Sequence, residues 1–108
     1  MKLKINNKYM EIKEAKTLPS RLIGLMGKEN IDYGMLFKKC NAIHTYFMKE
    51  EIDVIGLNED NQIIYIYRSV PKNKIVKISG DNKKTSILEL PKNTSKNFVV
   101  GSILRIED

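Results

Sequence analysis

A cysteine and a histidine, Cys40 and His44, lie four positions apart and are the only residues of their kinds in the chain. On a helix this spacing would place the two side chains about 6 Å apart, near enough for a thiolate–imidazole pair in nucleophilic catalysis. On a strand the same spacing separates them by about 13 Å. Residues 43–48 are rich in β-branched and aromatic side chains, which favours a strand. We therefore interpret Cys40 and His44 as separate structural residues, unless a loop at residues 41–42 brings them together.

An acidic side chain, Asp53, interrupts the otherwise apolar segment 52–57. A buried carboxyl group must be protonated, paired with a charge or held by backbone N–H groups, and the first two conditions are common at functional sites. Pairing this segment with residues 63–70 predicts that Asp53 lies opposite Ile66, among aliphatic side chains. Two interpretations stay open: a functional acid, or a structural acid bound to a backbone N–H or to Arg21.

The relation between Asp53 and His44 depends on the turn at residues 49–51. If these three residues form the whole turn, His44 and Met48 point away from Asp53. A shift of one residue in the register reverses the result, because side chains alternate between the two faces of a strand.

The methionines Met26, Met35 and Met48 are a further set of candidates for contact with a ligand. Methionine is flexible and polarizable, so it lines adaptable apolar pockets and also fills ordinary cores. With His44 and Asp53 these three residues make up the predicted ligand-binding set.

The chain is basic, with 19 Lys and Arg residues against 13 Asp and Glu residues and a formal net charge of +6. The lysines are scattered through segments that resemble turns, which is typical of a solvated surface. Nucleic-acid binding would require them to gather on one face. Tyr65 and Tyr67 could stack on bases in that case, or they could bridge the core and the solvent.

Short β-prone segments recur along the chain and are separated by residues typical of turns. They are residues 3–5, 8–12, 35–37, 43–48, 52–57, 63–70, 75–78, 87–90 and 103–106. Asn6 and Asn7 suit a tight turn between the first two segments. Several segments are apolar on both faces, which predicts that both faces are covered.

One short amphipathic helix is predicted near residues 18–26. Leu18, Leu22 and Leu25 recur there at helical spacing, and Thr17 can cap the start. Gly24 lowers the helix propensity by about 1 kcal/mol relative to alanine, which suggests that it permits close packing. We expect an α+β, mostly β fold: a compact antiparallel β-barrel or sandwich with this one short helix packed on it.

The length of 108 residues suits a single domain, residues 1–108. No segment approaches the roughly 20 apolar residues that cross a membrane, and the first residues lack the apolar region of a secretory signal, so we expect a cytoplasmic protein. One cysteine and one histidine cannot complete a closed zinc site or an internal disulfide. No motif for a cofactor is present, and we predict neither a metal nor a cofactor.

Several motifs occur in a fixed order along the chain. They are Arg21, Gly24-Leu25-Met26, Gly34-Met35-Leu36-Phe37, Ile43-His44-Thr45 with Met48, Ile52-Asp53-Val54, Pro71, and Leu88-Glu89-Leu90-Pro91 with Gly101. Their order and spacing, over residues 15–106, resemble domain-of-unknown-function family 192. The resemblance implies a compact β-rich domain and no established activity. Gly56-Leu57 and Ser102 depart from the family pattern, which favours a phenylalanine after the aspartate strand and an aspartate after the late glycine.

Because no complete catalytic set is present, we expect a non-catalytic ligand-binding or accessory module with its site near His44, Met48 and Asp53. An enzyme is the alternative, with Asp53 or His44 as the acid–base group and Cys40 as the nucleophile. Binding of nucleic acid through lysines with Tyr65 and Tyr67 is a third hypothesis. The partner would be a small molecule or a protein, and the sequence indicates neither its identity nor the oligomeric state.

Overall fold

Seven strands form one curled sheet in the computed structural model, which describes the backbone of residues 1–108 and all side chains except those of Leu18, Pro19 and Leu22. The strand order is β6-β5-β8-β3-β2-β1-β9. The bounds are β1 Lys2–Ile5, β2 Lys8–Glu14, β3 Gly34–Lys38, β5 Ile52–Leu57, β6 Ile63–Val70, β8 Ser86–Pro91 and β9 Ile106–Glu107. A separate sheet of two strands consists of β4, Ala42–His44, and β7, Ile75–Lys77.

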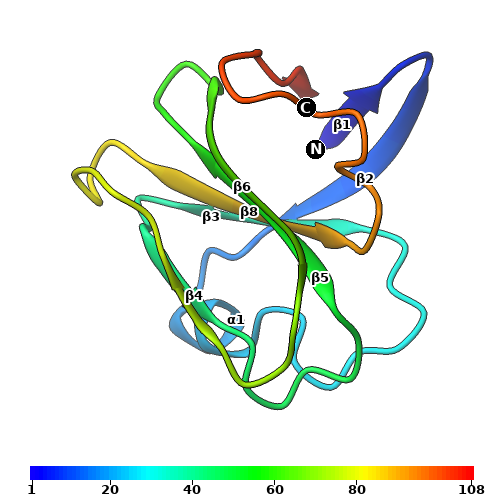
Figure 1. The fold of residues 1–108 in the computed structure, drawn as a ribbon, viewed down its shortest axis with the longest axis vertical. Coiled ribbons are helices and arrows are strands. Elements are labelled where there is room, and N and C mark those ends of the chain that lie inside the picture. The colour runs from blue at the N-terminus through cyan, green and yellow to red at the C-terminus, as the bar shows by residue number, and fades with distance from the viewer.

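The two edges of the large sheet are connected by residues 101–107. Gln62, which precedes β6, forms a bridge with Ile103. Further along the same segment, the Lys4 N–H of β1 donates to the Arg105 carbonyl at 3.0 Å, and β9 then pairs with β1. The sheet therefore curls into a partly closed barrel, with the late segment beside β1 in Figure 1. The radius of gyration of 12.5 Å is close to the roughly 13 Å expected for a compact domain of this size.

Each face of the curled sheet carries its own hydrophobic core. The inner core fills the barrel and contains Leu3, Ile12, Leu36, Ile55, Leu57, Ile63, Leu88, Leu90 and Leu104. The outer core lies between the sheet and the β4–β7 layer and contains Ala15, Leu25, Phe37, Met48, Ile52, Val54, Val70, Val76, Ile78 and Ile87. All residues of β5 are buried because this strand, which lies between β6 and β8, contributes side chains to both cores. The predicted mostly β, compact fold with both faces covered is confirmed.

A helix of six residues, α1, covers Leu18–Ile23. Thr17 is its N-cap, and Gly24 ends it with a φ of 50°, short of the longer helix that we predicted. The predicted packing of this helix depends on Leu18 and Leu22, whose side chains lie outside the described part of the structure, so it stays a prediction. Within the described part of the chain, no helix is long and apolar enough to cross a membrane.

The prediction of a strand over residues 43–48 is wrong beyond His44, where β4 ends. Phe47 has a φ of 62°, and the Thr45 hydroxyl donates to the Pro71 carbonyl at 2.7 Å, so the chain turns there instead of continuing as a strand. β4 pairs with β7 and does not join β5 in a meander. β2 and β3 pair in parallel, which corrects the expected fully antiparallel sheet.

The predicted register between β5 and β6 is also wrong. Ile66 lies opposite Ile55, and not opposite Asp53. At Asp53 the register shifts, so that this one residue of β5 faces both Arg68 and Ser69 of β6 in a β-bulge. The positive φ of Ser69, 52°, is the local cause of the bulge.

Candidate functional site

A cavity of about 280 Å³, here called the α1 cavity, lies between α1, β4 and the outer face of the large sheet. It is lined by Arg21, Ile23, Gly24, Leu25, Phe37, Cys40, Ala42, Ile43, His44, Met48 and Glu89. Most of these side chains are apolar, and the polar ones come from α1, from β4 with the loop before it, and from β8. Such a combination of an apolar wall and a few polar groups is typical of small-molecule sites.

Glu89 of β8 is the polar group at the base of this cavity. Only 3% of the residue is exposed, and its Oε1 atom has no hydrogen-bond partner among the described residues. Burial raises the pKa of the Glu89 carboxyl from 4.5 to about 8, although the backbone N–H of Leu25 acts in the opposite direction. The carboxyl group is therefore protonated at neutral pH and can donate a hydrogen bond into the cavity.

Gly24 brings the end of α1 close to Glu89. A Cβ atom built on Gly24 would lie 3.1 Å from Glu89 Oε1 and 3.2 Å from Phe37 Cζ. The φ of 50° at this position is also unfavourable for residues with a side chain. The glycine that lowers helix propensity in the sequence thus makes room for the buried acid.

His44 and Cys40 both line the α1 cavity, because the loop before β4 bends the chain between them. They do not form the hydrogen-bonded pair that a catalytic dyad requires, since each bonds to the backbone. His44 Nδ1 accepts from the Tyr46 N–H at 3.2 Å, which places the proton of the neutral ring on Nε2. The Cys40 thiol donates to the Ala42 carbonyl at 3.1 Å.

Arg21 supplies a positive charge to the lining of the cavity. Its Nη1 atom donates to the Lys38 carbonyl at 3.0 Å and to the Ala15 carbonyl at 3.5 Å. Both acceptors are neutral, so the charge of the guanidinium is not cancelled by these contacts. The expected alternative, a bond from Arg21 to Asp53, is replaced by these two backbone contacts.

Asp53 lies outside the α1 cavity, on the other face of the sheet. Val54 is directly opposite Glu89 and Asp53 is directly opposite Leu90, so the two acids point to opposite faces. Asp53 is fully buried, and its carboxylate accepts three hydrogen bonds. The donors are the Ser69 N–H at 2.9 Å, the Ser95 N–H at 3.0 Å and the Ser95 hydroxyl at 2.6 Å. This geometry is that of a structural acid.

The predicted ligand-binding set is divided by the fold. His44 and Met48 line the α1 cavity, whereas Met26 and Met35 are not among its described lining residues. Met35 lies directly opposite Glu89 in the β3–β8 pair and packs on the outer core.

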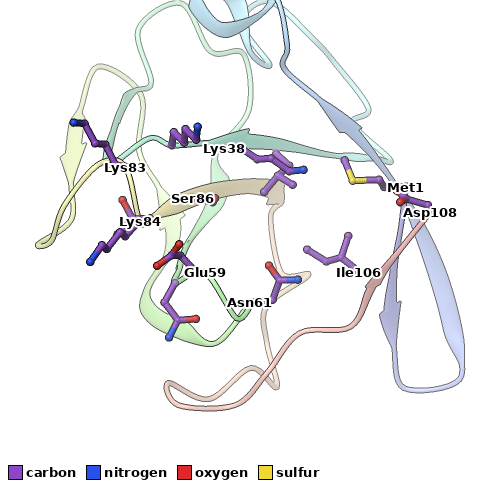
Figure 2. A pocket seen from close by; sticks show the side chains of 13 residues that line it. Met1, Lys38, Glu59, Asn61, Lys83, Lys84, Ser86, Ile106 and Asp108 are labelled. Atoms are coloured by element: carbon purple, nitrogen blue, oxygen red, sulfur yellow. The ribbon is translucent and has the colours of Figure 1, made fainter.

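A second, larger cavity of about 420 Å³ lies at the end of the barrel. Its lining includes Lys38, Lys39, Lys83 and Lys84 and the acids Glu59 and Asp108. Figure 2 shows the ammonium ends of Lys83 and Lys84 turned outward, away from Asn61 and Ile106. Because these charges do not converge on one point, we regard the α1 cavity as the stronger candidate.

Tyr65 and Tyr67 are half-buried and pack against the outer core. They lie opposite Gly56 and Val54 on β5, on the face of the sheet that the β4–β7 layer covers. Their rings therefore take part in the packing of the outer core.

A family model for DUF192, described as "Uncharacterized ACR", matches residues 1–106. The chain belongs to the DUF192 family. The resemblance seen in the motifs of the sequence is confirmed by this match.

Two solved structures share the DUF192 chain's fold. A protein of unknown function from Novosphingobium aromaticivorans DSM 12444 has a TM-score of 0.80 and 14% identity, covering 97% of this chain and 82% of that one. A "putative transcription regulator" from Sinorhizobium meliloti 1021 has a TM-score of 0.73 and 21% identity, covering 98% and 89%. At these identities the likeness supports the fold alone. No curated protein matches the chain.

Glu89 is the site residue that our sequence reasoning missed. It lies between Leu88 and Leu90 in an apolar segment, so the signal is the same as the one that singled out Asp53. An acid inside a buried strand identifies both residues, and the pattern does not indicate which of the two has partners.

Proposed function

We propose that this chain is a non-catalytic binding module and that the α1 cavity holds a small molecule with an apolar body and one polar group. The observation that carries the proposal is the unpartnered Oε1 of Glu89, buried at the base of the cavity. Leaving a buried polar atom without a partner costs about 1–3 kcal/mol. A bound ligand that hydrogen-bonds to Glu89 would offset that cost.

Two further features support binding over catalysis. The Cys40 thiol is directed to the Ala42 carbonyl, and His44 Nδ1 is occupied by the Tyr46 N–H, so the cysteine has no adjacent general base. A nucleophile without such a base is weakly activated. Asp53, one of the two acid–base candidates of the enzyme hypothesis, is held by three hydrogen bonds from Ser69 and Ser95.

The experiment is a titration of the ¹⁵N-labelled protein with a set of small amphiphilic fragments, followed by NMR. Fragments that bind as proposed will shift the amide signals of Leu25, Phe37, His44 and Met48, which line the cavity. The variant Glu89→Met will lose these shifts. Glu59→Met, which changes an exposed acid of the other cavity, is the matched control and will keep them.

Two results would contradict the proposal. One is a set of fragments that leaves the signals of the α1 cavity unchanged while it shifts those of the barrel end. The other is fragment binding at the α1 cavity that changes to the same extent in Glu89→Met and in its control Glu59→Met.

A further inference from the structure

We propose that the ligand of the α1 cavity is a monocarboxylate with a short apolar tail, whose carboxylate accepts a hydrogen bond from the Glu89 carboxyl group near the positive charge of Arg21. This inference rests on the proposed function and adds the chemical class of the ligand. It is carried by the unpartnered Glu89 oxygen in the cavity, by the charge of the lining and by its apolar wall.

The charge of the lining favours an anion. Arg21 and Glu89 are the formally charged residue types among the lining residues. The pKa of Glu89 is raised to about 8, so at pH 7 its carboxyl group is mainly neutral and the net charge of the lining is positive. An anionic group is therefore attracted to the cavity, although the cavity contains a glutamate.

The hydrogen-bonding state of Glu89 favours a carboxylate in particular. A protonated carboxyl group is an O–H donor, and its strongest acceptor is an ionised oxygen. A carboxylate would satisfy the unpartnered side of Glu89 and lie in the field of Arg21 at once. An ammonium group offers no acceptor for the Glu89 O–H and would be repelled by Arg21, whereas a neutral amide would gain less than a carboxylate from the charge of Arg21.

The residues that pair with Glu89 in the sheet are neutral. Its partners on the flanking strands, Met35 of β3 and Val54 of β5, do not titrate. The titratable groups that face the cavity from the other elements are Arg21 of α1, Cys40 of the loop before β4 and His44 of β4.

The rest of the wall accommodates an apolar tail. Leu25, Phe37, Ile43 and Met48 line the cavity, whose volume is about 280 Å³. A tail of a few carbon atoms fills such a space, and each buried methylene contributes about 0.8 kcal/mol to binding.

The test uses three probes that share one tail and differ in the polar group: hexanoate, hexanamide and hexylamine. Each is titrated into the full chain at about pH 7, and the dissociation constant is taken from the NMR shifts of the cavity residues. Hexanoate will bind about tenfold more tightly than the other two, because only it uses both Glu89 and Arg21. At about pH 9 its affinity will fall about tenfold, because Glu89 is then ionised and repels the carboxylate.

Two variants separate the contributions. Glu89→Gln keeps a hydrogen-bond donor that does not ionise, so it will bind hexanoate at both pH values with little change between them. Arg21→Gln will weaken hexanoate while it leaves hexanamide unchanged, and the hexanamide titration also shows that the cavity is intact.

A preference for hexylamine or hexanamide overturns the inference and leaves the proposed function standing, because the cavity then binds a ligand of another class. The inference is also overturned if the Glu89→Gln variant binds hexanoate with an affinity that still depends on pH. If none of the three probes shifts the cavity signals, the carboxylate class is rejected, and the proposed function is judged by the fragment titration alone.

Discussion

Two buried acids on neighbouring strands, Asp53 and Glu89, have opposite environments. Asp53 faces the inner core and accepts three hydrogen bonds from Ser69 and Ser95. Glu89 faces the outer core, one position away in the register, and has an oxygen without a partner among the described residues. Among the described residues, Asp53 lines neither the α1 cavity nor the cavity at the end of the barrel, whereas Glu89 lines the α1 cavity.

The difference indicates what each acid contributes. The carboxylate of Asp53 connects the bulge of β6 with the loop at Ser95, two regions far apart in the sequence, so it stabilises the fold. The buried Oε1 of Glu89 has no partner among the described residues, which costs free energy. Such unfavourable local features are common at functional sites.

The largest effect is expected for Asp53→Ala. The substitution leaves the Ser69 N–H and the Ser95 N–H and hydroxyl without their acceptor, and it will lower the free energy of unfolding by about 3–5 kcal/mol. Urea denaturation measures the change, with Asp60→Ala in the exposed turn as the control, which will change stability by less than about 0.5 kcal/mol. Equal losses for the two variants would show that Asp53 is not structural.

A dependence of stability on pH is expected from Glu89. Its pKa is 4.5 for the free group and about 8 in the folded state, so the folded chain holds the proton more tightly. The free energy of unfolding is therefore highest below about pH 4.5, and it falls by about 2–4 kcal/mol as the pH rises to about 8. Urea denaturation of the wild type and of Glu89→Gln over this range measures the difference; parallel curves would refute the raised pKa.

A smaller effect is expected for Gly24→Ala relative to Gly27→Ala. Both glycines have a positive φ, but only the Cβ at Gly24 would crowd Glu89 and Phe37, since nothing lies within 4 Å of a Cβ at Gly27. Gly24→Ala will therefore cost about 1–3 kcal/mol more than its control and will weaken fragment binding. Thermal denaturation and the NMR titration measure the two effects. Identical behaviour would mean that Gly24 has no role in the cavity.

The smallest effect is a gain in stability for Glu89→Met. Methionine keeps the length of the side chain and removes the unpartnered oxygen, but it also removes the acceptor of the Leu25 N–H, so the gain in stability at neutral pH will be below about 1 kcal/mol. Urea denaturation measures the gain, and the loss of cavity binding accompanies it. A destabilised Glu89→Met variant would place Glu89 with Asp53 among the structural acids.

Much of the fold follows from local pattern. The sequence predicts the segments 52–57 and 63–70 with the bounds that β5 and β6 have, because their apolar and β-branched residues are continuous. The register between them was not predictable, because the bulge depends on Asp53 holding the Ser69 N–H. The early end of β4 has a similar origin, since Thr45 bonds to Pro71 and to Lys74.

The candidate site is only partly predictable because it, too, depends on contacts between residues far apart in the sequence. His44 and Met48 were singled out from their residue types, and Asp53 and Glu89 give one and the same signal in the sequence. Which acid is satisfied depends on Ser95, which lies 42 positions from Asp53. A pattern of neighbouring residues contains no information about that contact.

The connection of both sheet edges by residues 101–107 has a consequence for aggregation. A proteolytic cut in this segment would expose the backbone of β1 and the start of β6 in a single step. Unpaired strands of this kind recruit strands from other molecules. This short stretch therefore protects the molecule from self-association through its β-strands, in addition to completing its barrel.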